Sequence, residues 1–215
     1  MPKMVKKQYH NKLDEIYKQS GDVVSYLKSY GNYLSELLAA LDHDEVRRVA
    51  DCFLKARALA ATIYFVGNGG SAATASHFAQ DLTEVGRKAG LNGFRTLSLT
   101  DSVPYITALA NDYGYESVFT WQLAELFKKN DVLVAISASG NSPNVVNAVQ
   151  YAKKSGGVTI GLVGFDGGKL KTMCDHVINV KTRPGEYGPV EDVHMVLDHM
   201  ITTYLLMKLR RSQDE

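Results

Sequence analysis

The chain has 215 residues, of which 45% are hydrophobic and 22% are charged, proportions typical of a soluble globular protein. Its 24 basic and 23 acidic residues leave a formal net charge of +1 at pH 7, so no overall field favours nucleic acid or a membrane surface as a partner. An anionic ligand would therefore have to be held by a local site.

No targeting or membrane-spanning segment is expected from the sequence. The lysines among the first residues are not followed by the apolar run of a signal peptide, and no window approaches 18 consecutive apolar residues. Cys52 and Cys174 are too few for a disulfide framework and are expected to be free thiols in a reducing compartment. These features predict a cytoplasmic protein.

The first part of the chain, from about residue 5 to residue 60, is predicted to be helical. Its apolar residues recur at three- and four-residue spacing, the period of an amphipathic helix. They include Leu13, Ile16, Tyr17, Val24, Leu27, Leu34, Leu37, Leu38 and Leu41. Asp44 is the predicted N-cap of a further helix. The apolar face of that helix is formed by Val46, Val49, Ala50, Phe53 and Leu54.

From residue 61 onward, short β-branched and aromatic runs alternate with helical segments. The runs are TIYFVG, FRTLSLT, DVLVAIS, VTIGLVG and HVINV, and a last helix is predicted from about residue 190 to residue 211. This alternation predicts an α/β fold with a parallel sheet that helices cover on both faces. Because no low-complexity linker interrupts the chain, residues 1–215 are predicted to form a single domain.

The loop after the first predicted strand has the composition of an anion site. In FVGNGGSAATASHFAQDL, residues 65–82, Gly67, Gly69 and Gly70 let a ligand approach the main chain, and Ser71 lies near a helix N-terminus that favours a negative charge. Gly67, Gly69 and Ala72 also satisfy a dinucleotide fingerprint, but the acidic residue that should follow the second strand comes too late at Asp101. The alternative is a tight turn that only requires glycine.

A second loop, AISASGNSPNVV at residues 135–146, carries three hydroxyls. Ser142 before Pro143 is a helix-start signature, but Ser137 and Ser139 exceed what a cap needs. The chain has no P-loop motif, so a nucleotide site of that type is not expected. Both loops are predicted to lie at the carboxyl ends of the strands, where open parallel sheets bind ligands. Together they indicate a small phosphorylated metabolite.

Metal-ligating side chains occur in two predicted helices. His77 and Asp81, four residues apart, share a helix face, although such a pair is also common by chance. In VEDVHMVLDHM, residues 190–200, the spacing allows three pairs: Asp192 with His199, His194 with Asp198, and Glu191 with His199. Periodicity alone does not choose among these pairs. His43 and His176 are assigned no chemistry.

The segments GNGGSA, SHFAQDL, ALANDYGYE and ISASGNS, with the late histidine-bearing helix, resemble the sugar isomerase (SIS) domain and, within it, the phosphoheptose isomerases. The resemblance extends over about residues 30 to 210. It implies a flavodoxin-like, five-stranded parallel sheet flanked by helices. It also implies a homotetramer with active sites at subunit interfaces, in which the helices of residues 1–60 are integral to the fold and the oligomer.

The resemblance further implies an aldose–ketose isomerase acting on a small phosphorylated sugar. The implied reaction converts sedoheptulose 7-phosphate to a glycero-manno-heptose 7-phosphate through an enediol, with Asp81 as base and His199 as acid. A divalent metal, zinc, would be held by His77, Asp81, Glu191 and His199, which leaves His194 and Asp198 to support the site or pack the helix. The implied substrate positions are Asn68, Gly69, Gly70, Ser71, Asn111, Asp112, Ser137, Ser139, Ser142 and Glu191.

Three positions depart from the family pattern. Asp81 stands where the family has glutamate, Glu191 where it has glutamine, and Ala138 where a threonine is common. A base displaced by about 1 Å can cost on the order of 100-fold in a catalytic step, whereas a His/Asp/Glu/His set still suits zinc. These departures keep open an isomerase or epimerase that acts on another phosphosugar.

The alternative from another class is a non-catalytic SIS protein, a regulator or assembly protein that binds a phosphosugar or a protein partner. Such a protein would be expected to lack ligand-type side chains at the four metal positions. All four positions of this chain can coordinate a metal, which favours the enzyme.

Overall fold

The five predicted strand segments all form strands in the computed structural model, which describes residues 10–214. The strands are β1 (Thr62–Val66), β2 (Arg95–Ser98), β3 (Val132–Ser137), β4 (Val158–Gly164) and β5 (His176–Val180). They form one sheet in the order β2-β1-β3-β4-β5, and every neighbouring pair is parallel. This is the strand order of flavodoxin-like sheets, so the predicted fold class is confirmed.

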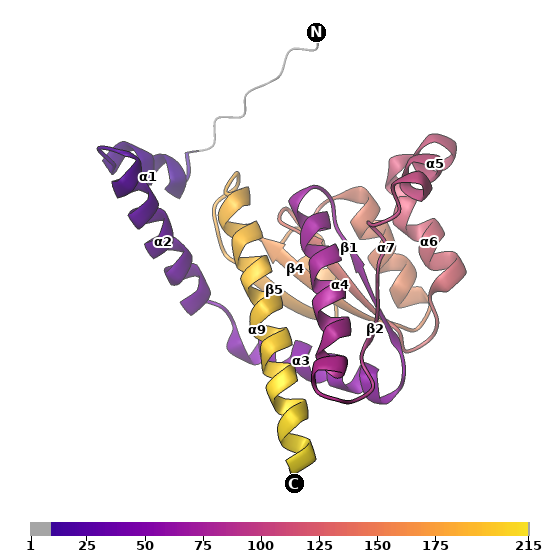
Figure 1. Ribbon diagram of the computed structural model, residues 1–215. Helices are drawn as coiled ribbons and strands as arrows, with labels where there is room; N and C mark the ends of the chain where they lie inside the picture. The colour runs from indigo at the N-terminus through magenta and orange to yellow at the C-terminus, as the bar shows by residue number, and fades with distance from the viewer. Residues whose placement is uncertain (1–9, 215) are drawn as a thin grey trace.

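Helices cover both faces of the sheet (Figure 1). One layer contains α3 (His43–Ala58), α4 (Gly70–Lys88) and α9 (Tyr187–Asp214), and the other contains α5 (Val103–Tyr113), α6 (Val118–Leu126) and α7 (Pro143–Lys154). The short segments η1 (Tyr115–Ser117) and α8 (Leu170–Met173) lie in connections. Ile63 and Phe65 pack into the first layer while Tyr64 and Val66 pack into the second, as the two-residue period of a strand requires.

The N-terminal region forms separate helices, α1 (Lys12–Gln19), α2 (Val23–Ala39) and α3, whereas residues 5–9 of the predicted helical region lie outside the described residues. The predicted cap of the third helix was wrong by two positions. Asp42 is the N-cap and accepts a hydrogen bond from the Glu45 N–H at 3.0 Å. Asp44 lies in the first turn, where its charge complements the helix dipole.

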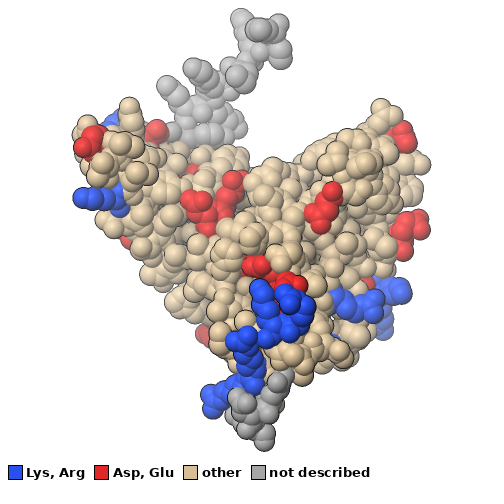
Figure 2. All heavy atoms as spheres, in the orientation of Figure 1, with Lys and Arg blue, Asp and Glu red and all other residues tan. Residues whose placement is uncertain are grey.

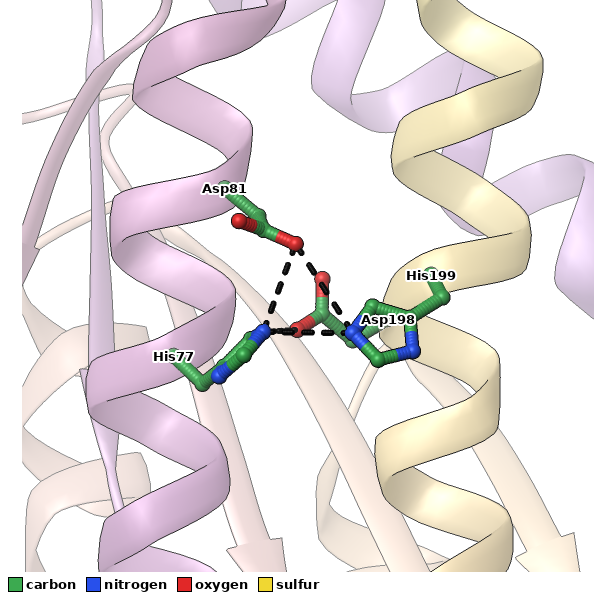
Figure 3. A group of neighbouring side chains, drawn as sticks. All are labelled: His77, Asp81, Asp198 and His199. Carbon is green, nitrogen blue, oxygen red and sulfur yellow. Dashed lines mark hydrogen bonds and ion pairs between the residues drawn. The ribbon is translucent and has the colours of Figure 1, made fainter.

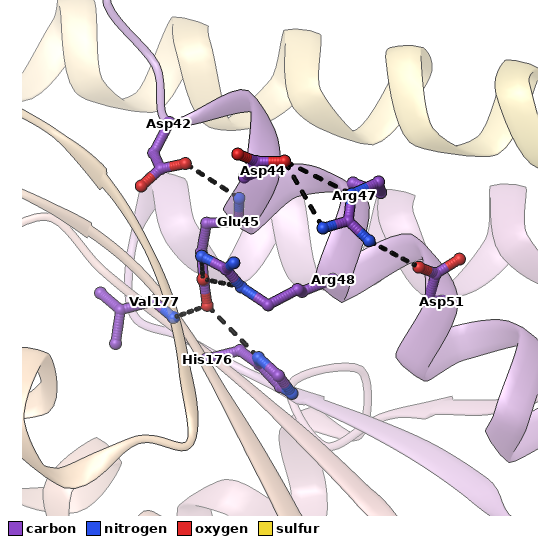
Figure 4. A network of polar contacts seen from close by, with 8 residues as sticks. All are labelled: Asp42, Asp44, Glu45, Arg47, Arg48, Asp51, His176 and Val177. Atoms are coloured by element: carbon purple, nitrogen blue, oxygen red, sulfur yellow. Dashed lines mark hydrogen bonds and ion pairs between the residues drawn. The ribbon is translucent and has the colours of Figure 1, made fainter.

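Two buried or half-buried glutamates attach these helices to the rest of the fold. Glu45 connects α3 to β5: its Oε1 accepts the Val177 N–H at 2.9 Å and lies 3.3 Å from Nδ1 of His176 (Figure 4). Glu186, fully buried just before α9, accepts the Lys12 N–H and the Tyr33 hydroxyl, each at 2.6 Å. His176 therefore serves the fold, as expected for a histidine without assigned chemistry.

None of the helices in residues 10–214 is long and apolar enough to cross a lipid bilayer. On the face shown in Figure 2, uncharged residues cover most of the surface, and charged side chains form small separate groups of either sign. The single-domain organisation of residues 1–215 stays a prediction.

Candidate active site

Helices α4 and α9 pack against each other and bring four ligand-type side chains together (Figure 3). His77 and Asp81 come from α4, and Asp198 and His199 come from α9; one ligand atom of each lies within 4.8 Å of the others. We call these four residues the α4–α9 cluster. The two histidines face each other with 3.1 Å between their Nε2 atoms. Oδ2 of Asp81 lies 3.4 Å from Nε2 of His77 and 3.9 Å from Nε2 of His199.

The members of the α4–α9 cluster differ sharply in exposure. The side chains of His77, Asp81 and His199 are 43%, 23% and 55% exposed, whereas Asp198 is 0% exposed. Neither carboxylate oxygen of Asp198 has a hydrogen-bond partner among the described residues. Burial, and secondarily the negative charge of Asp81, raises the pKa of Asp198 to about 7.

This arrangement fits a divalent metal ion. A buried carboxylate without a partner is unfavourable, and the unpaired oxygens of Asp198 are next to two imidazoles and a second carboxylate. Two imidazole nitrogens and two carboxylate oxygens are a donor set that suits zinc. The cluster can therefore hold such an ion between the two helices.

Glu191 is the one predicted metal ligand that does not join the cluster within this chain. Its carboxylate lies against Gly70 at the start of α4: a Cβ atom added at Gly70 would come within 2.3 Å of Oε2 of Glu191. The structure also decides the two other pairings that the helix spacing allowed. Asp192 accepts the Tyr30 hydroxyl at 2.6 Å instead of pairing with His199, and Nε2 of His194 lies 3.3 Å from the Val163 carbonyl oxygen instead of contacting Asp198. Packing of α9 against the core sets these directions, which periodicity left open.

The two predicted phosphate loops lie next to each other, as expected from the carboxyl ends of β1 and β3. The side-chain amides of Asn68 and Asn144 form a reciprocal pair of 2.9 Å hydrogen bonds, and the Tyr115 hydroxyl donates to Oδ1 of Asn68 at 2.8 Å. Ser71 is the second residue of α4, whose N-cap is Gly69, and it is buried. Asn144 therefore holds the first loop against the second, and Tyr115 of η1 holds the first loop from another side.

The three serines of the second loop surround the start of α7. Ser142 is its N-cap but makes no capping hydrogen bond with its side chain; its hydroxyl instead lies 3.3 Å from that of Ser137. Ser139 accepts the Asn141 N–H at 3.3 Å. Since the Ser142 hydroxyl does not cap the helix but pairs with another serine of the loop, the serines can serve a ligand together; their phosphate-binding role stays a prediction.

Asn111 and Asp112 lie on α5 and are exposed. The Asn111 amide donates to Oδ1 of Asp112 at 2.8 Å, and no described contact connects the pair to the α4–α9 cluster. Their substrate role stays a prediction.

Sequence reasoning missed two residues of this site. Asp198 was interpreted as a supporting or packing residue, although an acid on the apolar face of a helix is itself a signal that a partner is required. Asn144, 1% exposed, was not singled out, and nothing in its local sequence indicates a partner 76 positions away.

The fully buried His194 predicts a pH dependence of stability. Burial lowers the pKa of His194 from 6.5 to about 4, so between these values the unfolded chain binds a proton that the folded protein does not. The free energy of unfolding should therefore fall as the pH falls from 6.5 to 4, with a contribution from His194 on the order of 3 kcal/mol.

His194→Gln removes this titration and keeps a donor for the Val163 carbonyl. The free energy of unfolding of both metal-free proteins is measured by urea unfolding between pH 4 and pH 7. It should change less steeply with pH in the variant than in the wild type. The raised pKa of Asp198 acts with the opposite sign, but it is present in both proteins and cancels from the difference. Equal slopes would contradict the prediction.

Comparison with known proteins agrees with the fold. The model of the SIS domain family matches residues 25–164, more than half of the chain. The phosphoheptose isomerase of Aliarcobacter butzleri is 44% identical over 140 residues, which cover 65% of this chain and 72% of that protein. The phosphoheptose isomerase of Fusobacterium nucleatum is 35% identical over 187 residues, covering 83% of this chain and 92% of the relative.

The chain belongs to the SIS domain family, among the phosphoheptose isomerases. A solved structure agrees: that of the phosphoheptose isomerase from Neisseria gonorrhoeae superimposes with a TM-score of 0.75 at 32% identity, over 85% of this chain and 96% of that one. Membership of the phosphoheptose isomerases, inferred above from the loop and helix motifs, is confirmed.

Proposed function

We propose that the protein is a phosphosugar isomerase that converts sedoheptulose 7-phosphate to a glycero-manno-heptose 7-phosphate. The observation that carries the proposal is the α4–α9 cluster, which places an acid and histidines side by side in a member of the phosphoheptose isomerases. The names of the relatives support the heptose phosphate as the substrate.

The proposed mechanism is proton transfer between adjacent carbons. Asp81 removes a proton from the carbon beside the carbonyl and returns it to the neighbouring carbon. His199 gives a proton to the carbonyl oxygen and accepts one from the neighbouring hydroxyl, so the reaction has no net proton change. One oxygen of Asp81 and one ring nitrogen of His199 face the cluster while the others point away (Figure 3), which leaves each group an atom for the substrate.

The cofactor we propose is zinc, held by His77, Asp81, His199 and a fourth ligand. When bound, a divalent ion would polarise the carbonyl group and stabilise the enediolate. The residues of the two loops, with Ser71, Ser137, Ser139 and Ser142, would bind the phosphate. Gly70 and His77 are seven residues apart on α4, or about 10 Å along the helix axis, so one extended sugar phosphate can reach both places.

The direct test is incubation of the purified protein with sedoheptulose 7-phosphate and detection of the aldose product by NMR. Asp81→Asn, which removes the base, should abolish turnover, whereas Asp81→Glu should match or exceed the wild type because glutamate is the family residue. Turnover of a shorter ketose phosphate in place of the heptose would favour the other isomerase, and binding without turnover would favour the regulator.

We also propose a cytoplasmic homotetramer with active sites at subunit interfaces. Exposed apolar side chains support self-association: Val23, Val24 and Leu27 on α2, and Met200, Tyr204 and Met207 on α9. Cys52 and Cys174 are free, and burial raises the pKa of both thiols, to about 11 and about 12, in keeping with unreactive cysteines in a reducing compartment. Light scattering of the purified protein measures the molar mass.

A further inference from the structure

We infer that Asp198 is a metal ligand in this protein and takes the place that the family pattern gives to Glu191. Helices α4 and α9 of one chain then supply a complete set of four ligands: His77, Asp81, Asp198 and His199. The inference rests on the metal site of the proposed function, but it does not depend on which sugar phosphate is the substrate.

The first observation is the burial of Asp198 without a hydrogen-bond partner. Its side chain is 0% exposed, and neither Oδ1 nor Oδ2 has a hydrogen-bond partner among residues 10–214. Buried carboxylates in proteins are normally paired, hydrogen-bonded or bound to a metal. Its one close charged neighbour in the cluster is His77, whose Nε2 lies 4.0 Å from Oδ2, so the carboxylate is directed at the other members of the α4–α9 cluster (Figure 3).

The second observation is the spacing of the ligand atoms. Four ligands at about 2.1 Å from a tetrahedral zinc ion lie about 3.4 Å from one another. The distances in the cluster are 3.1 Å between the two histidines, 3.4 Å and 3.9 Å from Asp81 to the histidines, and 4.0 Å from Asp198 to His77. Small side-chain movements are sufficient to close these distances around one ion.

The third observation is the register of the two helices. The contact between Glu191 and Gly70 fixes how α9 lies along α4. Seven residues advance a helix by about 10 Å and rotate it by only about 20° from the starting face. Asp198 follows Glu191 by seven residues, and His77 follows Gly70 by seven. Asp198 therefore meets the metal-binding part of α4, whereas Glu191 meets the substrate loop.

The charges of the set are also balanced. Two carboxylates and two neutral imidazoles compensate the two positive charges of a divalent ion, so the ion and the buried Asp198 stabilise each other. Asp81 of α4 supplies the first carboxylate of this set, and Asp198 of the facing helix α9 supplies the second. Glu191 is then left to contact the substrate beside Gly70.

Zinc binding by matched variants tests the inference. Wild type, Asp198→Asn and Glu191→Ala are stripped with a chelator and titrated with zinc against a chromophoric competitor; alanine is used at position 191 because glutamine would restore the family ligand. Loss of a residue that only supports a ligand costs about 10–100-fold in affinity. We expect the zinc affinity of Asp198→Asn to fall more than about 100-fold and that of Glu191→Ala to stay within about threefold of the wild type.

Two further readouts do not depend on activity. Cobalt should give the wild type and Glu191→Ala the visible absorption of a four-coordinate site, and Asp198→Asn should lack that spectrum. Asp198→Leu guards against misfolding: replacing an unpaired buried carboxylate by an apolar side chain should leave the metal-free protein at least as thermally stable as the wild type. Added zinc should raise the melting temperature of the wild type but not that of Asp198→Leu.

The inference is overturned if Asp198→Asn binds zinc as the wild type does, if Glu191→Ala loses zinc instead, or if the wild type binds none. Failure of the proposed function is a different result. A wild type that binds zinc through Asp198 but does not convert sedoheptulose 7-phosphate leaves the ligand assignment intact and refutes the reaction.

Discussion

His199→Ala is expected to reduce kcat for sedoheptulose 7-phosphate by at least about 100-fold, and by up to about 10⁴-fold. The imidazole is proposed both to exchange a proton with the substrate oxygens and to provide Nε2 to the metal site, where it lies 3.1 Å from Nε2 of His77. Alanine removes both functions. Because the side chain of His199 is 55% exposed, its loss should leave little cavity and little effect on folding.

The measurement is the initial rate of aldose formation, with zinc content determined on the same samples. His43→Ala is the matched control, since His43 is exposed at the start of α3 and is not part of the cluster. Its rate should equal that of the wild type. A His199→Ala protein that keeps more than about a tenth of the wild-type kcat would contradict both roles.

The second large effect is expected from Gly140→Ala, in the serine loop. Gly140 has a φ of +61°, and a Cβ atom there would lie 2.0 Å from the backbone carbonyl oxygen of Gly167. Backbone cannot move aside as a flexible side chain can. The left-handed conformation costs about 1–2 kcal/mol and the overlap about 1–3 kcal/mol more, so the free energy of unfolding should fall by about 2–5 kcal/mol.

The same substitution should impair substrate binding. The Gly140 N–H donates to the Ser137 carbonyl at 2.9 Å, and the Gly140 carbonyl accepts the Leu170 N–H at 3.1 Å. A displaced backbone would move the hydroxyls of Ser137 and Ser139, so KM should rise by about tenfold or more, an increase that corresponds to about 1.4 kcal/mol of lost binding.

Gly90→Ala separates the steric effect from the conformational one. Gly90 has a φ of +71°, but no atom lies within 4 Å of the position of an added Cβ. Gly90→Ala should lower the free energy of unfolding only by the cost of the left-handed conformation, about 1–2 kcal/mol, and should leave KM unchanged. Urea unfolding and steady-state kinetics measure both variants. Equal losses of stability in the two variants would refute the steric explanation for Gly140.

The fold was largely predictable because its signals are local. Each strand is a short apolar run, and residues such as Ile63 and Tyr64 pack against opposite helix layers whatever the rest of the chain does. The cap of α3 was misplaced because Asp42 and Asp44 are both good cap residues and two positions cannot be separated by propensity.

The site was predictable only in part. The resemblance selected His77, Asp81 and His199, which the structure brings together, but it could not weigh the departures of this chain from the family pattern. The second acid of the cluster, Asp198, is 117 positions from Asp81 in the sequence, and periodicity offered three acids on the same helix as partners for the histidines.

The sequence by itself determined the strands, the glycine and serine loops and the supply of ligand-type residues, since each depends on the preferences of a few neighbouring residues. Only the tertiary structure decided which acid of α9 faces α4. Val193, Leu197, Ile201 and Leu205 are buried in the core and fix the rotation of that helix. Once the rotation is fixed, Asp198 is turned inward beside His77 while Glu191 lies against Gly70. That choice depends on packing between distant segments, which no local pattern contains.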